Sequence, residues 1–242
     1  MRSTQLPKET RLQATARAAS RAAATARKIK LHHYAVLLIA ELLFILVYPF
    51  FVGTSFRDGV MRSMAVVVFA AALYAVLGRG KITIIAFVLG VPAILIHAVN
   101  VAGYFESLQT LSLILGLVFL GFMTSVFIWS IVSDPSVTTD TLAGAVSAYM
   151  LMGITFGIAY ALIDHLVPGA FRDTLEPGKH LTQSEFTFFS FITMTTVGYG
   201  DIVPWDAHAR SVAMIEAVIG IMYPAVLISR LVGMHGSKRE HE

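Results

Sequence analysis

The stretch FSFITMTTVGYGDIVP, residues 189–204, sets Thr and Gly residues between apolar segments. The apolar run that leads into it, residues 184–194, is too short to cross a hydrocarbon core of about 30 Å, which takes about 20 helical residues. Thr182 and Glu185 have the spacing of a capping box, which marks the start of a helix. We therefore predict a short helix that ends where Thr195 begins the run of Thr and Gly residues.

The rest of the chain has the composition of a membrane protein. Of its 242 residues 56% are hydrophobic and only 14% are charged, with a mean hydropathy of +0.73, whereas a soluble domain has about 25% charged residues. The absence of Cys excludes disulfides and thiolate metal sites. We predict an all-α polytopic membrane protein, in which the short helix is re-entrant and six transmembrane helices lie at about 34–52, 60–77, 82–103, 108–132, 141–166 and 208–233.

The extended TTVGYG segment, residues 195–200, offers a row of backbone carbonyls. Gly198 and Gly200 take positive φ without strain, so that successive carbonyls can turn toward one line, and Thr196 adds a hydroxyl at its deep end. Carbonyl oxygens suit an alkali cation that exchanges its water shell for protein oxygens. One segment cannot surround an ion, so we expect a homotetramer. The short helix would point the partial negative charge of its C-terminal end at the cation path.

Residues 195–200 resemble the selectivity-filter signature of potassium channels, and the flanking residues extend the resemblance. Asp201 and Pro204 follow as in many such channels, and Gly220 lies mid-way along the next helix, where the family commonly has a hinge. The similarity covers roughly residues 140–234 and is to bacterial channels of the two-helix ion-channel type, in the voltage-gated-like superfamily. It implies that K+ is the permeant ion, with the Thr196 hydroxyl at the innermost site and the carbonyls of five residues as ligands: Thr196, Val197, Gly198, Tyr199 and Gly200.

The resemblance also implies a division of the chain. We expect a basic cytoplasmic N-terminal segment (1–31), a four-helix accessory domain (32–133), a pore domain of outer helix, pore helix, filter and inner helix (140–234) and a short cytoplasmic tail (235–242). The fourth helix, residues 108–133, has no Lys or Arg. A voltage sensor needs several such charges, because each one yields only about 2.3 kcal/mol per 100 mV. We therefore expect a domain with the layout of a sensor but no voltage gating by its fourth helix.

The distribution of Lys and Arg predicts the orientation in the membrane. Eight of the 18 lie before Leu31, and Arg79, Lys81, Lys238 and Arg239 fall on the same side if six helices alternate. We expect a multi-pass plasma-membrane protein with both termini cytoplasmic. The basic N-terminal segment is interpreted as a cytoplasmic anchor, with anionic-lipid binding or a transit peptide as alternatives. No nucleic-acid partner is expected.

The side chains around the filter differ from those of many relatives, in which an aromatic N–H or an acidic group braces the filter. Phe188, Phe189 and Ile192 take these positions and cannot donate a hydrogen bond. We expect the filter to be supported by the packing of the phenylalanines and by Thr193 and Thr195.

Two acidic residues lie within apolar helices, where ionisable groups indicate function. Glu216 is interpreted as a further filter support, as a charge that borders the cavity, or as a neutral carboxyl hydrogen-bonded to a neighbouring helix. Glu41 is expected to have a structural role, with Arg62 as its partner. Asp201, directly after the filter, completes the predicted support.

The last helix also has the features of a gate. Gly220 and Pro224 are one turn apart, which is enough to kink it. We expect Ile221, Pro224 and Ile228 to line the cytoplasmic mouth as an apolar gate.

These features together predict a potassium-selective channel that conducts passively through a homotetrameric pore. The alternatives are a weakly selective cation channel and a non-conducting membrane subunit. An enzyme is not expected, because the sequence has no Ser/His/Asp set, metal motif or phosphate-binding loop.

Overall fold

The computed structural model describes residues 33–51, 57–101, 108–133 and 139–239. The elements in these ranges are α2 (His33–Phe51), α3 (Arg57–Ala75), α4 (Lys81–Val101), α5 (Gln109–Ser133), α6 (Thr139–Leu166), β1 (Phe171–Asp173), α7 (Gln183–Met194), β2 (Ile202–Pro204) and α8 (Ala207–Arg239). All six predicted long helices and the predicted short helix are present. The last helix extends further than expected and includes residues 235–239, whose cytoplasmic location stays a prediction. The basic segment 1–31 lies outside the described residues.

Four of the described helices are long and apolar enough to cross a membrane: Lys81–Asn100, Gln109–Ser133, Thr141–Leu166 and Ala207–Arg230. The helices α2 and α3 contain shorter apolar stretches, His33–Val47 and Gly59–Ala75. The chain is therefore a multi-pass helical membrane protein, and a crossing by all six helices stays a prediction.

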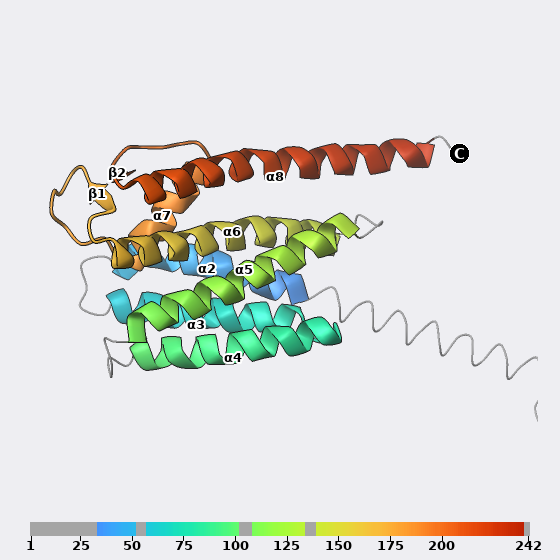
Figure 1. Ribbon diagram of the computed structural model, residues 1–242. Helices are drawn as coiled ribbons and strands as arrows, with labels where there is room; N and C mark the ends of the chain where they lie inside the picture. Colours follow the sequence, from blue (N-terminus) through green and yellow to red (C-terminus); the bar gives the residue numbers. More distant parts are fainter. Residues whose placement is uncertain (1–32, 52–56, 102–107, 134–138, 240–242) are drawn as a thin grey trace, which may run out of the picture.

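The long helices lie roughly along one direction and alternate in sense along the chain (Figure 1). The helix α6 lies in the middle. It contacts α7 and α8 on one side and α2 and α5 on the other (Figure 1). The first residues of α2 and the last turns of α8 lie at one end of the bundle, and α7 with both strands lies at the opposite end (Figure 1).

One apolar core joins α2, α3, α4, α5 and α6. Leu37, Phe119, Phe127 and Leu151 are among its fully buried side chains. A second, smaller core is aromatic and lies under the strands, where Tyr160 of α6 is fully buried. The helix α6 belongs to both cores and so links the first four described helices to the segment that carries the filter signature.

Glu41 is fully buried where α2 meets α6. Its Oε2 accepts a 2.6 Å hydrogen bond from the Ser147 hydroxyl, and its Oε1 has no partner among the described residues. The prediction that Arg62 pairs with Glu41 was wrong, because Arg62 lies near the start of α3 while Glu41 lies at the middle of α2. The Arg62 guanidinium instead donates to the Asn100 carbonyl at 3.4 Å.

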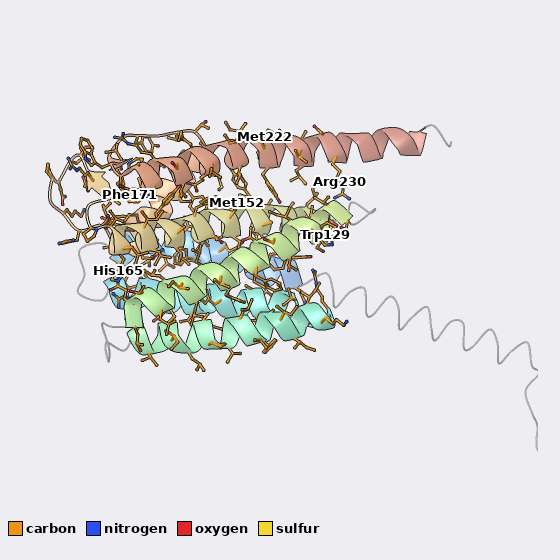
Figure 2. The ribbon with its side chains drawn as sticks, in the orientation of Figure 1. Trp129, Met152, His165, Phe171, Met222 and Arg230 are labelled. Atoms are coloured by element: carbon orange, nitrogen blue, oxygen red, sulfur yellow. The ribbon has the colours of Figure 1, made fainter. Side chains whose placement is uncertain are left out.

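Polar contacts tie the helices together at both ends of the bundle (Figure 2). At one end the Arg230 guanidinium of α8 donates to the Ile131 carbonyl of α5, beside Trp129, which is exposed. Exposed Trp and basic residues at helix ends are typical of a membrane–water interface. At the other end His165 Nε2 lies 2.8 Å from Thr110 Oγ1.

Two short strands, which the sequence analysis did not predict, pair on either side of α7. They are antiparallel, with Phe171 opposite Pro204, Arg172 opposite Val203 and Asp173 opposite Ile202. The N–H groups of Trp205 and Asp206 then both donate to the Ala170 carbonyl, at 2.7 and 3.1 Å. The segment between Ala170 and Trp205 therefore begins and ends at the same place, as the predicted re-entrant path requires.

Candidate functional site

Two glycines of α6, which have no side chain, leave room for α7 to pack closely against this helix. A Cβ on Gly153 would lie 2.8 Å from the Phe191 ring, and one on Gly157 would lie 2.8 Å from the Thr187 Cα atom. Close approach through glycines four residues apart is a recurrent form of helix contact in membranes. This spacing of Gly153 and Gly157 is visible in the sequence, but the contact with α7 was not predicted from it.

Gly220 of α8 performs the same function on the opposite side of α7. A Cβ there would lie 2.3 Å from the Met194 carbonyl oxygen and 2.8 Å from the Met194 Cα atom. The helix α8 runs without a break through Gly220 and Pro224. This contact gives a reason for the glycine that is independent of the predicted hinge, and the hinge stays a prediction.

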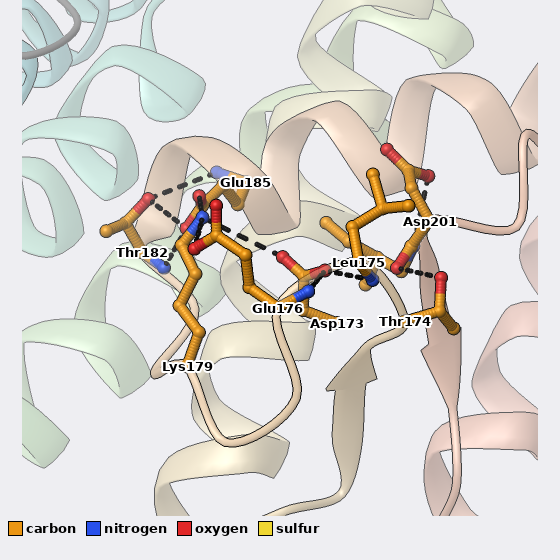
Figure 3. Close-up of polar contacts among 9 residues, drawn as sticks. Asp173, Thr174, Leu175, Glu176, Lys179, Thr182, Glu185 and Asp201 are labelled. Atoms are coloured by element: carbon orange, nitrogen blue, oxygen red, sulfur yellow. Dashed lines mark hydrogen bonds and ion pairs between the residues drawn. The ribbon is translucent and has the colours of Figure 1, made fainter.

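The N-terminal end of α7 has the predicted capping box (Figure 3). The Thr182 N–H donates to Glu185 Oε2 at 2.7 Å, and the Glu185 N–H donates to Thr182 Oγ1 at 3.4 Å. Lys179 Nζ lies 3.0 Å from Glu185 Oε1, 3.4 Å from Glu176 Oε2 and 3.7 Å from Asp173 Oδ2. One ammonium thus joins α7, the loop before it and the end of β1.

Two of the carboxyl groups near Lys179, those of Glu185 and Asp173, have a lowered pKa. Partial burial raises the pKa of Glu185, but the Thr182 N–H and the Lys179 ammonium outweigh it and bring the pKa below its ordinary value. The Glu176 N–H is the main cause that lowers the pKa of Asp173, with the Leu175 N–H and Lys179 adding to it. The loop that precedes α7 is therefore sensitive to acid.

Residues 195–200, which resemble a selectivity filter and are called the filter segment, have backbone φ angles that alternate in sign. Thr196, Gly198 and Gly200 have φ of +62°, +51° and +80°, while Val197 and Tyr199 between them do not have positive φ. Alternation between left- and right-handed conformations turns successive N–H groups to one side of the chain and leaves the carbonyls on the other. For the β-branched Thr196 this φ is an outlier. Such strain persists only where the surrounding structure imposes it, and it clusters at functional sites.

The N–H groups of the filter segment face α7. They donate to carbonyls in its last turn: Thr195 to Phe191 at 3.0 Å, Thr196 to Thr193 at 3.0 Å, and Val197 and Gly198 to Ile192 at 2.8 and 3.2 Å. In contrast, none of the hydrogen bonds in the described part of the chain ends on a carbonyl of residues 196–199. This row of four carbonyls is available to a ligand.

The outer end of the filter segment is bonded to the hairpin. The Thr174 hydroxyl donates to the Gly200 carbonyl at 2.9 Å and to the Asp201 carbonyl at 3.1 Å, and its N–H also donates to Asp201 at 2.7 Å. The Asp201 carboxylate accepts from the N–H of Ile202. Gly200, the fifth predicted ligand, thus already has a protein partner for its carbonyl. Thr174 was not predicted, because it lies 26 residues before Gly200 and no local pattern relates the two.

The two phenylalanines predicted as filter supports have different surroundings. The Phe188 ring stacks nearly parallel to the Tyr199 ring, with centroids 6.3 Å apart. Phe189 is buried edge-on against Tyr160 and Phe171, at 5.1 and 5.4 Å. Phe188 therefore contacts the filter segment itself, whereas Phe189 anchors α7 in the aromatic core.

The two threonines predicted as supports act mainly through the helix end. The Thr195 hydroxyl donates to the Phe191 carbonyl at 2.6 Å, within α7. Thr193 offers its carbonyl to the Thr196 N–H at 3.0 Å.

Glu216 lies between α6, α7 and α8 and is fully buried. Its carboxyl is hydrogen-bonded to the Tyr160 hydroxyl of α6 and to the Ser190 hydroxyl of α7. This burial does not fit a charge that borders an open cavity. A partner behind the filter and a neutral carboxyl hydrogen-bonded to neighbouring helices are both compatible with these contacts, and both stay predictions. Tyr160 and Ser190 were not predicted, because no spacing in the sequence relates them to Glu216.

The predicted gate residues lie on the exposed part of α8. Ile221 and Ile228 are 56% and 60% exposed, and Pro224 is half-buried. On the covered side of the same helix, the Tyr223 hydroxyl donates to the Ala145 carbonyl of α6 at 2.9 Å. The helix therefore packs on α6 and α7 on one side, and an apolar face of it is exposed in the part of the chain that the structure describes.

The similarity to known proteins covers the part of the chain that contains this site. A family model described as "Ion channel" matches residues 154–235. Protein LctB of Geobacillus stearothermophilus is 30% identical over 118 residues, which are 48% of this chain and 87% of the relative. Protein LctB of Bacillus caldotenax is 27% identical over 122 residues, 49% of this chain and 90% of the relative.

A plant protein shares a shorter region. Two pore potassium channel c of Oryza sativa subsp. japonica is 31% identical over 94 residues, 39% of this chain and 19% of the relative. Fold, site and similarity together define a helical membrane channel. The chain belongs to the ion-channel family.

Proposed function

We propose that this protein is a potassium-selective channel that conducts K+ passively through a homotetrameric pore. The observation that carries the proposal is the filter segment. The N–H groups of residues 195–198 are bonded to the end of α7, and the carbonyls of residues 196–199 have no partner among the residues that the structure describes. Partially negative oxygens in a row replace the water shell of an alkali cation. The proposed ligands are the carbonyls of Thr196, Val197, Gly198 and Tyr199, with the Thr196 hydroxyl at the inner end.

Two further observations support assembly into a tetramer around one axis. A single chain supplies one row of carbonyls, and a row on one side of an ion cannot replace its whole water shell. In one chain Val197 and Tyr199 are 51% and 73% exposed. The apolar side chains of α8 that point away from α6 are also exposed: Met214, Ile215, Val218, Ile221, Met222, Val226 and Ile228. Contact with a neighbouring chain or with the pore lumen would account for the exposure of these filter residues and of these α8 side chains.

The remaining parts of the proposal concern gating and location. The fourth predicted span, α5, has no Lys or Arg, so opening by movement of charges on that helix is not proposed. We propose that helices α2 to α5 form an accessory domain, that residues 1–31 contact anionic lipid headgroups, and that the protein lies in the plasma membrane with both termini cytoplasmic. Ile221, Pro224 and Ile228 are proposed as the inner gate, with Gly220 as its hinge.

The test is a recording from purified protein in planar bilayers with opposed K+ and Na+ gradients and a voltage ramp. We expect a reversal potential close to that of K+ and a conductance with little dependence on voltage. A reversal potential near zero would favour a weakly selective cation channel, and absence of current, with intact tetramers in the same preparation, would favour a non-conducting subunit.

A matched pair of glycine variants gives the experiment its control. Gly198→Ala places a side chain at a φ of +51° in the filter segment, whereas Gly121→Ala places one in α5 with no atom within 4 Å. We expect loss of K+ current in the first and unchanged current in the second.

A further inference from the structure

The buried cluster of Glu216, Tyr160 and Ser190 connects the three helices that surround the filter segment. All three residues are fully buried. Glu216 Oε2 is bonded to the Tyr160 hydroxyl and Oε1 to the Ser190 hydroxyl, and Ser190 Oγ also lies 2.7 Å from the Gly153 carbonyl oxygen. The cluster therefore has three contacts: two to the carboxyl and one to a backbone carbonyl.

A count of protons decides the state of the carboxyl. Each hydroxyl has one proton to donate, and a carbonyl has none. Because Gly153 can only accept, the Ser190 proton is used in that contact. The Tyr160 proton is used on Glu216 Oε2. The contact between Ser190 and Glu216 Oε1 then has a proton only if the carboxyl supplies it.

The surroundings of the cluster agree with a neutral acid. The groups that face Glu216 are Tyr160 from α6 and Ser190 from α7, with Tyr149 of α6 within electrostatic range. None of the described Lys, Arg or His residues forms an ion pair with it. An ionised carboxylate buried without a cationic partner is costly, and such groups are normally neutralised.

We propose that Glu216 carries a proton and that Glu216, Ser190 and Tyr160 together form a positioning unit that fixes α7 against α6 and α8. Glu216 donates to Ser190, Ser190 donates to Gly153, and Tyr160 donates to Glu216. Ser190 lies directly before the turn of α7 whose carbonyls hold the filter N–H groups, so the unit sets the position of the filter segment. The expected effect of this unit on conduction rests on the proposed function, whereas the assignment of a proton to Glu216 does not.

Infrared spectroscopy of the purified protein tests the proton without any need for conduction. A protonated carboxyl has a C=O stretching band that a carboxylate lacks. The spectrum of wild type minus Glu216→Gln is expected to contain this band at neutral pH. The variant Glu41→Gln is the control, since it removes the other buried acid, and the Glu216 band should survive in it. A carboxylate band in the Glu216 difference spectrum would overturn the proposal.

Substitutions within the unit test the positioning role. The Gln amide can donate to Ser190 and accept from Tyr160, so Glu216→Gln should keep K+ flux within about twofold of wild type. Tyr160→Phe and Ser190→Ala should each lower K+ flux roughly fivefold, which is the effect of one neutral hydrogen bond. As the pH is raised, wild-type flux should fall, whereas the flux of Glu216→Gln should stay constant.

The outcomes separate the two proposals. If wild type shows the protonated band but no K+ current, the proposed function fails and the assignment of the proton stands. If wild type conducts and Glu216→Gln loses flux as severely as Glu216→Ala at equal tetramer yield, the positioning unit as described is wrong.

Discussion

Replacement of Gly220 by Ala is the sharpest test of how α7 is held. The added Cβ would lie 2.3 Å from the Met194 carbonyl oxygen, and ordinary contact begins at 3.4 Å, so about 1 Å of separation is missing. The blocking atoms include the Met194 carbonyl oxygen and Cα, which are backbone, so a change of side-chain rotamer cannot relieve the clash. Either α8 or the end of α7 must move, and the filter segment is bonded to that end.

The size of the effect follows from two opposing terms. Overpacking of a well-packed site costs about 1–3 kcal/mol, and the upper part of that range applies to a backbone clash. Ala gains about 1 kcal/mol over Gly in a helix. The net loss at Gly220 is therefore about 1–2 kcal/mol, whereas the control Gly121→Ala in α5, with no atom within 4 Å, should gain about 1 kcal/mol.

Thermal unfolding of the two variants in the same detergent measures this difference. A gap of about 2–3 kcal/mol corresponds to a difference in Tm of about 4–12 °C for a chain of this size, with Gly220→Ala the lower. K+ flux should fall in Gly220→Ala because the filter segment is displaced. Equal Tm values for the two variants, with only opening altered in Gly220→Ala, would refute the packing argument and leave the glycine as a hinge.

Three further predictions concern the contacts around the site. Thr174→Val removes the hydroxyl that donates to the Gly200 and Asp201 carbonyls. We expect the reversal potential to shift toward zero with little change in Tm. The control Thr174→Ser keeps the hydroxyl and should behave as wild type. Ser147→Ala leaves the buried Glu41 carboxyl without its partner and should lower the free energy of unfolding by about 1–3 kcal/mol. Ser147→Ala combined with Glu41→Leu should recover most of that loss, and a double variant less stable than the single one would contradict the argument. The lowered pKa of Glu185 contributes stability that is present at neutral pH and lost as the pH falls below about 4. The drop in Tm on acidification should be smaller in Lys179→Met, and an unchanged acid profile in that variant would count against the ion pair.

The helices could be predicted from sequence because their causes are local. Each long helix follows from a continuous apolar run, and the start of α7 follows from the capping box of Thr182 and Glu185. The bent path after Thr195 follows from Gly198 and Gly200, both of which have the positive φ that the sequence suggested. The exception is Thr196, whose φ of +62° no residue preference would predict.

The contacts between distant residues could not be predicted in the same way. The partner of Glu41 depends on how far α2 and α6 are shifted along each other, and no spacing in the sequence relates Ser147 to Glu41. The contact of Thr174 with Gly200 depends on a strand pairing of three residues each, which is too short to leave a periodic pattern. The role of Gly220 against Met194 required the crossing of two helices to be known.

The strand pair also makes the segment between Ala170 and Trp205 a unit that could be exchanged between channels. The Ala170 carbonyl accepts from the N–H groups of Trp205 and Asp206, and β1 pairs with β2 just inside this junction. Everything between these residues begins and ends at one point of the scaffold. Residues 170 and 205 are therefore natural boundaries for a chimera, because a graft at these positions cuts no helix and joins the scaffold through one short ladder of backbone hydrogen bonds. The grafted helix must also fit against Gly153, Gly157 and Gly220.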